Sequence, residues 1–260
     1  MRELTFGYSP CPNDTFAFHA LTHGLVDAPF RVRPVLLDIE ELNRQAHTGA
    51  FDLTKLSVGA FAAVGERYRL LRSGAALGMG VGPLVVARTA MSLAEAARGP
   101  IAIPGCETTA FRLLRLAAPG LGEVREMRYD RILRAVADGE VAAGLIIHES
   151  RFTYAAHGLA QVTDLGDWWE RDTGLPVPLA GICARADLDA ATRAAAEAAI
   201  RASVQHAFDH PEASRDYVRA HAQEMSDAVC DQHIALYVNR HSLDVGDAGM
   251  QAIARLVGAV

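Results

Sequence analysis

Residues 4–22 are LTFGYSPCPNDTFAFHALT. The first five, Leu4 to Tyr8, have the apolar and aromatic composition of a short strand. The turn Ser9-Pro10-Cys11-Pro12 follows, and Asn13-Asp14-Thr15 supplies N-cap candidates for a helix that reaches Thr22. A strand, a loop and a helix in this order predict an α/β fold.

The same alternation continues on both sides of a glycine-rich stretch at residues 74–82. Before this stretch, the pattern predicts strands at 32–37 and 52–56, and helices at 40–47 and from Ser57 onward. After it, the predicted strands are 84–87, 101–103, 124–128, 143–147 and 162–165, and the predicted helices are 108–116 and 131–138. Such alternation indicates mainly parallel sheets covered by helices.

The chain then returns through residues 176–184 to an alanine-rich helix at 187–210, which Pro211 stops, and three further helices are expected after it. We therefore expect a bilobal, periplasmic-binding-protein-like α/β fold of type II. Lobe I would be residues 1–87 plus 179–260, and lobe II would be the inserted residues 88–178. Ligands of such folds sit in the cleft between lobes. A single larger doubly wound sheet is the structural alternative.

The composition excludes several classes of protein. The 260 residues carry a net charge of -6 and contain no block rich in Lys or Arg, so nucleic acid is not an expected partner. No apolar run approaches the roughly 20 residues of a membrane span, so no membrane insertion is expected. Met1-Arg2-Glu3 lacks the pattern of an export signal, and the four cysteines are widely spaced. We expect a cytoplasmic protein with reduced thiols.

Two predicted helix starts are candidate anion sites. Lys55-Leu56-Ser57 ends a strand and opens a helix, where backbone N–H groups, a hydroxyl and an ammonium can meet an anion. Thr108-Thr109-Ala110 repeats that arrangement after a proline-glycine turn. If both face one ligand, their dipoles favour a carboxylate by about 0.3–1 kcal/mol each. An ordinary N-cap is the alternative for each, and a small carboxylate is the ligand that the pair predicts.

His148 is the candidate base, because it ends the apolar stretch Ala143 to Ile147 and precedes Glu149. A histidine moves protons readily near neutral pH, and a neighbouring carboxylate increases its basicity. Consecutive strand residues point to opposite faces, so Glu149 need not touch it. A structural histidine is the alternative.

Other side chains with reactive or aromatic groups are expected to be structural. His19 with His23 and His206 with His210 have helical spacing but lack the glutamate of H-E-x-x-H, so we predict no metal. Cys11 has no recognisable base beside it. Trp168 and Trp169 are expected to pack in the core, with stacking of one ring on an aromatic substrate as the alternative.

Residues 7–16, GYSPCPNDTF, resemble the N-terminal signature of the 1,4-dihydroxy-6-naphthoate synthase family. The resemblance continues, to about Ala184, through residues 55–57, 77–84, 103–105, 108–110, 145–149, 151–154 and 174–181.

The resemblance implies a carbon–carbon lyase of the futalosine route to menaquinone that converts cyclic dehypoxanthinylfutalosine to 1,4-dihydroxy-6-naphthoate without a cofactor. It implies His148 as proton acceptor and an acidic aromatic small molecule as substrate. By the same resemblance, the substrate-binding residues are Lys55, Leu56, Ser57, Thr109 and Ala110. We expect Thr108, Ser9, Asn13 and Asp14 to line the cleft of a monomer or homodimer. The alternatives are a chorismate dehydratase-like lyase of the same pathway, a non-catalytic carboxylate-binding protein and a ligand-sensing regulatory domain.

Overall fold

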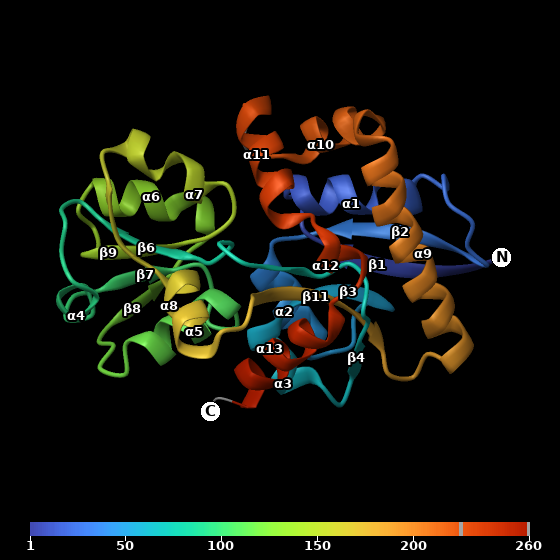
Figure 1. The fold of residues 1–260 in the computed structure, drawn as a ribbon, viewed down its shortest axis with the longest axis horizontal. Helices are drawn as coiled ribbons and strands as arrows, with labels where there is room; N and C mark the ends of the chain where they lie inside the picture. Colours follow the sequence, from blue (N-terminus) through green and yellow to red (C-terminus); the bar gives the residue numbers. More distant parts are fainter. Residues whose placement is uncertain (224–225, 259–260) are drawn as a thin grey trace. The chain divides into compact units, whose positions relative to one another are not determined.

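The computed structural model describes residues 1–223 and 226–258, and the chain divides into two compact units (Figure 1). Unit 1 comprises Met1–Gly78 and Pro178–Val260, and unit 2 comprises Met79–Val177. The sequence pattern predicts the first boundary after Ala87, whereas the observed division falls after Gly78. The difference arises because β6 (Leu84–Ala87) pairs on both sides with strands of unit 2.

The sheet of unit 1 has the strand order β2-β1-β3-β11-β4, and β5 pairs with β11. Its strands are β1 (Arg2–Tyr8), β2 (Phe30–Leu36), β3 (Leu53–Ser57), β4 (Tyr68–Leu70), β5 (Ala76–Gly78) and β11 (Val177–Arg185). β1 runs parallel to β2 and β3, and β11 runs antiparallel to β3 and β4. The carboxyl ends of β1 and β3 therefore share one edge of the sheet with the first half of β11.

Helices cover both faces of this sheet (Figure 1). On one face, Leu4, Phe6 and Tyr8 of β1 share an apolar cluster with α1 and α9; on the other, Leu56 of β3 packs with residues of α2 and α3. The helical segments of unit 1 are α1 (Pro12–Thr22), α2 (Ile39–Ala46), α3 (Val58–Val64), α9 (Ala190–Asp209), the 3-10 helix η2 (Pro211–Ser214), α10 (Arg215–His221), α11 (Asp227–Tyr237), α12 (Arg240–Leu243) and α13 (Gly246–Gly258).

The first strand–turn–helix forms as the sequence predicted, with one correction at the helix start. The N-cap of α1 is Cys11 and not a residue of the Asn13–Thr15 group, because Pro12 occupies the first turn. Proline suits that position, since its φ is already helical and its missing N–H is not needed there. Gly7 in β1 lies under α2, and a Cβ there would come within 2.9 Å of a Leu42 methyl carbon. The glycine is therefore required by close helix–strand packing.

The C-terminal part of unit 1 corrects a second expectation. Asp189 caps α9 through its carboxylate, which accepts from the Thr192 N–H at 2.8 Å, and the helix ends just before Pro211 as predicted. The sequence pattern predicts three helices after this point, whereas the described residues form η2 and helices α10 to α13. Asn239 caps α12, and this additional helix start is not apparent from the sequence pattern.

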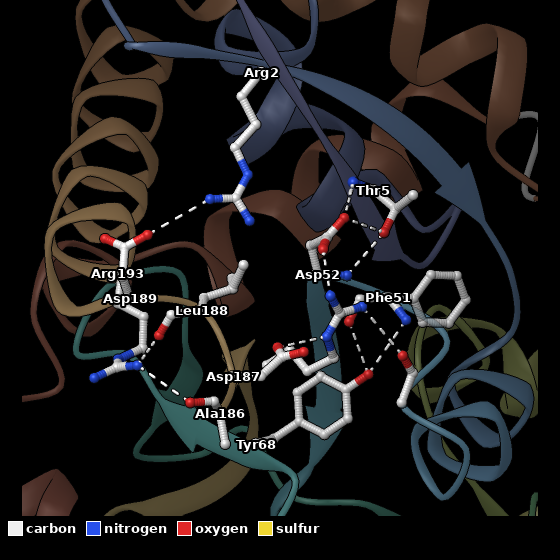
Figure 2. A network of polar contacts seen from close by, with 12 residues as sticks. Arg2, Thr5, Phe51, Asp52, Tyr68, Ala186, Asp187, Leu188, Asp189 and Arg193 are labelled. Carbon is white, nitrogen blue, oxygen red and sulfur yellow. Dashed lines mark hydrogen bonds and ion pairs between the residues drawn. The ribbon is translucent and has the colours of Figure 1, made fainter.

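A polar network joins strands of unit 1 at the edge opposite the β1 and β3 carboxyl ends (Figure 2). The Asp52 carboxylate accepts from the Thr5 N–H at 2.8 Å and pairs with Arg185 at 3.0 Å. The Tyr68 hydroxyl donates to the Phe51 carbonyl at 2.9 Å. These contacts link the loop before β3 to β1, β4 and β11, so this edge is a structural brace.

The sheet of unit 2 has the strand order β10-β6-β9-β7-β8 and is also mixed. β9 runs parallel to β7, which runs parallel to β8, while β6 runs antiparallel to β9 and β10. The elements of unit 2 besides β6 are α4 (Leu93–Ala96), β7 (Ile101–Ile103), α5 (Thr109–Ala117), β8 (Val124–Glu126), α6 (Tyr129–Ala137), β9 (Ala143–Ile146), α7 (Ser150–Thr153), the 3-10 helix η1 (Tyr154–His157), β10 (Ala160–Asp164) and α8 (Leu165–Thr173).

Helix α6 packs directly on β9. A Cβ on Gly144 would come within 2.5 Å of an Ile132 side-chain carbon and 2.7 Å of one from Val136. Both residues belong to the apolar cluster of unit 2.

Among residues 1–223 and 226–258, no helix has both the length and the apolarity that crossing a bilayer requires.

Candidate functional site

In unit 1, the expected site residues gather at the edge where β1 and β3 end. Asp14, in the first turn of α1, pairs with the Lys55 ammonium of β3, and their side chains are only 2% and 6% exposed. The same carboxylate accepts from the Ser9 hydroxyl at 2.7 Å and from the Asn13 amide at 2.8 Å. Because a buried charge needs a partner, this cluster holds the turn after β1 against β3.

Ser57 ends β3 and precedes α3, but it does not cap that helix with its side chain. Its hydroxyl oxygen accepts from the side-chain amide of buried Asn43 at 3.0 Å, and its N–H donates to the side-chain Oδ1 of Asn43 at 2.9 Å. A hydroxyl that accepts one hydrogen bond keeps its O–H to donate, so Ser57 can present a donor to an anion. Leu56 differs, because its side chain is buried between the sheet and α2. Only its backbone is available to a ligand.

In unit 2, the expected residues gather at the edge where β7 and β9 end. These strands are parallel neighbours, so the α5 start that follows β7 and the turn that follows β9 lie at one edge of the sheet. Thr108 is the N-cap of α5: its hydroxyl oxygen accepts from the Phe111 N–H at 3.1 Å and donates to the Gly105 carbonyl at 2.9 Å. Thr109 and Ala110, in the first turn, are both 3% exposed.

His148 lies in the turn between β9 and α7, one residue beyond the apolar stretch that predicted it. Its φ is +57°, and among the described residues no other non-glycine residue has a positive φ. That conformation is costly for a residue with a side chain and persists where the surroundings enforce it, which is common at functional sites. A half-buried histidine in such a turn suits proton transfer.

Two buried residues accompany His148. The rings of Tyr129, at the start of α6, and of His148 form an edge-to-face pair with centroids 4.8 Å apart. Its hydroxyl donates to Glu149 at 3.3 Å. A ring nitrogen of His148 and a carboxylate oxygen of Glu149 lie within 4.8 Å of one another. The strand alternation that separated His148 from Glu149 does not apply, because both follow the end of β9 in a turn.

The turn that carries His148 is anchored through Arg151 of α7. One guanidinium nitrogen donates to the Gly82 carbonyl, and another donates to Asp164 at 2.7 Å. Asp164 also caps α8, because it accepts from the Gly166 N–H at 2.7 Å. The backbones of Gly82 and Gly166 touch, so that a Cβ on Gly82 would lie 2.2 Å from the Gly166 Cα. This anchor joins α7, α8 and the segment before β6.

Tyr129 and Asn43 are not among the residues that the sequence predicted for the site. Both lie on helices at some distance in sequence from the residues they contact, and neither type is unusual at a helix start or on an amphipathic face. The aromatic Trp169 is buried at 2% exposure, as expected, and its indole N–H donates to the Pro176 carbonyl at 3.1 Å.

The described residues show limited metal-ligating potential within each unit. His19 with His23 and His206 with His210 form ring pairs with centroids 4.3 and 4.7 Å apart. Among the residues that the structure describes, neither unit by itself brings three histidine, cysteine or carboxylate side chains together.

The neighbourhood of His148 in unit 2 offers a base, a buried carboxylate and a helix start. Together these groups can move a proton and hold an anion.

The chain is similar to proteins of menaquinone biosynthesis. It matches the family described as "Menaquinone biosynthesis" over residues 4–260. A protein of Thermus thermophilus named 1,4-dihydroxy-6-naphthoate synthase is 57% identical over 256 residues, covering 98% of this chain and 93% of that protein. A protein of the same name from Streptomyces coelicolor is 46% identical over 259 residues, covering 98% and 91%.

Solved structures agree with the expected fold class. The crystal structure of a protein from Archaeoglobus fulgidus has a TM-score of 0.93 at 37% identity, covering 98% of this chain and 95% of that chain. The ligand-binding component of an ABC-type import system from Staphylococcus aureus has a TM-score of 0.73 at 16% identity, covering 99% and 91%. The latter likeness concerns the fold alone and confirms a periplasmic-binding-protein-like α/β fold.

The family match runs from residue 4 to the end of the chain, and it includes the GYSPCPNDTF stretch on which the resemblance was first drawn. The two relatives named as the synthase are similar over nearly the same length. This chain therefore belongs to the menaquinone biosynthesis family.

Proposed function

We propose that this chain is a carbon–carbon lyase that converts cyclic dehypoxanthinylfutalosine to 1,4-dihydroxy-6-naphthoate, with His148 as the proton acceptor. The observation that carries the proposal is that relatives 57% and 46% identical over nearly the whole chain are named as this synthase. The surroundings of His148 support its role. The half-buried imidazole lies in a turn where the backbone has a positive φ, and it lies beside the buried Glu149 carboxylate.

In the proposed reaction, His148 removes a proton from the substrate in a retro-aldol-like step. The carbon–carbon bond to the sugar-derived fragment breaks, and the carbocycle becomes aromatic as that fragment leaves. Aromatisation supplies much of the driving force, and the Glu149 carboxylate stabilises the imidazolium that forms. The proposal includes no cofactor.

The substrate carboxylate is proposed to bind at the start of α5. The first turn of α5, with Thr109 and Ala110, offers backbone N–H groups and the positive end of a helix dipole. In unit 1, Ser57 and Leu56 are proposed as substrate-binding residues because the resemblance implies them, with the Ser57 hydroxyl and the Leu56 backbone as the groups that can donate. Lys55 contributes a positive charge, although its ammonium is already paired with Asp14. Ser9 and Asn13 then act by holding Asp14 in place.

The direct test is to incubate the purified protein with cyclic dehypoxanthinylfutalosine and to follow naphthoate formation by absorbance and mass spectrometry. The proposal expects one equivalent of 1,4-dihydroxy-6-naphthoate per substrate consumed, with repeated turnover. The matched control is the H148N variant, which keeps a polar side chain of similar size but lacks the base. Naphthoate formed at the same rate by both proteins would remove His148 from the mechanism.

Two other outcomes define the rival functions. Binding of the substrate by calorimetry without any product would favour a non-catalytic carboxylate-binding protein, because a shared fold does not by itself imply catalysis. Conversion of chorismate in place of the futalosine derivative would favour a dehydratase of the same pathway. Either result would overturn the proposed reaction.

A further inference from the structure

We propose that Tyr129 is a positioning residue for His148: its ring contact sets the plane of the imidazole, and its hydroxyl holds the Glu149 carboxylate beside that ring. This inference rests on the proposed role of His148 as the base. It adds a residue that neither the sequence pattern nor the resemblance singled out.

The ring contact is specific in its geometry. The Tyr129 and His148 rings lie 4.8 Å apart between centroids, at an interplanar angle of 64°. Aromatic rings prefer such edge-to-face arrangements, which place a positive ring edge on a negative ring face. Tyr129 is only 6% exposed, so its own orientation is fixed by its surroundings. The imidazole thereby meets a rigid partner.

The rigidity of Tyr129 comes from its helix. Tyr129 is the first residue of α6, and α6 packs so tightly on β9 that Gly144 has no room for a side chain. The strand beneath α6 is the one that leads into the His148 turn. The helix that carries the tyrosine and the strand that carries the histidine are therefore fixed to each other through the core of unit 2.

The hydroxyl of Tyr129 acts on the second neighbour. It donates to Oε1 of Glu149 at 3.3 Å, and Glu149 is 7% exposed. A buried carboxylate is stabilised in its ionised form by hydrogen-bond donors. The carboxylate lies within 4.8 Å of an imidazole nitrogen, where a negative charge favours the imidazolium that forms when His148 accepts a proton. Arg151, the nearby cation of α7, is directed instead to Asp164 and Gly82.

The alternative is that Tyr129 merely fills space in the core. A double-mutant cycle separates the two, because a residue that acts through Glu149 has no further effect once the Glu149 charge is removed. The variants are Y129F, which keeps the ring, E149Q, which removes the charge, and Y129F/E149Q. Y129L removes the ring as well, and Y154F, a half-buried tyrosine of η1 in the same unit, is the matched control.

Each variant is measured in two ways: kcat and KM with cyclic dehypoxanthinylfutalosine, and the pH titration of the His148 imidazole by NMR, with the signal assigned through H148N. We expect Y129F to lower kcat by about tenfold, the loss of one hydrogen bond to a charged group, with KM within about twofold. Y129L should lose about a hundredfold, and Y154F should match the wild type. On the E149Q background, Y129F should change kcat by less than about twofold.

In the NMR titration, Y129F and E149Q should both move the His148 midpoint to lower pH, because Y129F releases the Glu149 carboxylate from its place beside the imidazole and E149Q removes its charge. The double variant should move it no further than E149Q. Additive losses, or an unmoved midpoint in both single variants, would overturn the positioning role. The titration needs no turnover, so it tests this inference even if the wild type proves inactive, a result that would refute the proposed function instead.

Discussion

Lys55 of β3 and Asp14 of α1 form an ion pair whose side chains are 6% and 2% exposed. The pair joins the helix that follows β1 to the neighbouring strand, at the edge where the expected substrate-binding residues of unit 1 gather. Breaking a buried pair from one side leaves the other charge without compensation in a low-dielectric environment. Changing either partner alone should therefore destabilise unit 1 more than changing both together.

Replacing Asp14 by Asn should destabilise the protein by about 3–5 kcal/mol, because the Lys55 ammonium would remain buried without its carboxylate. The double variant D14N/K55M should be more stable than D14N, since it buries no lone charge. Urea denaturation of the three proteins measures both differences. A D14N protein as stable as the wild type would show that the pair is not buried as described.

Replacing Arg151 by lysine, which keeps the positive charge, should still weaken the contacts that anchor the His148 turn. Lysine cannot reach the Gly82 carbonyl and Asp164 at once, so R151K should cost about 1–3 kcal/mol of unfolding free energy and lower kcat by loosening the His148 turn. The control is R134K, because Arg134 is 85% exposed and pairs with Asp138 on a helix surface. Equal effects of the two changes on stability and kcat would argue against an anchor.

A methyl group on Gly82 should be poorly tolerated. Its Cβ would lie 2.2 Å from the Gly166 backbone, a contact that cannot be relieved by a flexible side chain. We expect G82A to lower the melting temperature and to reduce turnover, because the backbone segment that accepts the Arg151 hydrogen bond must shift. The control is G120A, where a Cβ meets nothing within 4 Å. Similar melting temperatures for G82A and G120A would contradict the close approach.

His19 should make the stability of the protein depend on pH. Burial, together with the positive charges of His23 and His206, lowers the pKa of His19 below its ordinary value of 6.5. The unfolded chain therefore binds the proton more readily than the folded protein, and stability falls as the pH drops below about 6.5. In H19Q, the loss of unfolding free energy between pH 7 and pH 5 should be smaller. An unchanged loss would exclude this contribution.

Local patterns predicted most of the elements because their causes are local. β1 follows from the alternation of Leu4, Phe6 and Tyr8, and the start of α1 follows from Pro12 at the end of the turn. Both causes act within a few residues. The C-terminal helices were predicted less well, since their stops depend on caps such as Asn239 within a stretch without strong punctuation.

The sequence predicts where the candidate residues stand relative to the strands, but it does not predict which side chains they contact. His148 and the helix starts follow from where strands end, which the sequence shows. The pairing of Lys55 with Asp14, 41 residues apart, and of Tyr129 with His148, on different elements, depends on how strands order themselves in a sheet. The positive φ of His148 likewise depends on the surrounding fold, because a positive φ is uncommon for any residue other than glycine.

The most direct measurement of the central proposal is the binding and single-turnover rate of cyclic dehypoxanthinylfutalosine with the wild type and H148N. The proposed mechanism expects H148N to bind the substrate within a few-fold of the wild type while forming naphthoate at least about a hundredfold more slowly. Single-turnover rates that are equal in the two proteins would contradict His148 as the proton acceptor.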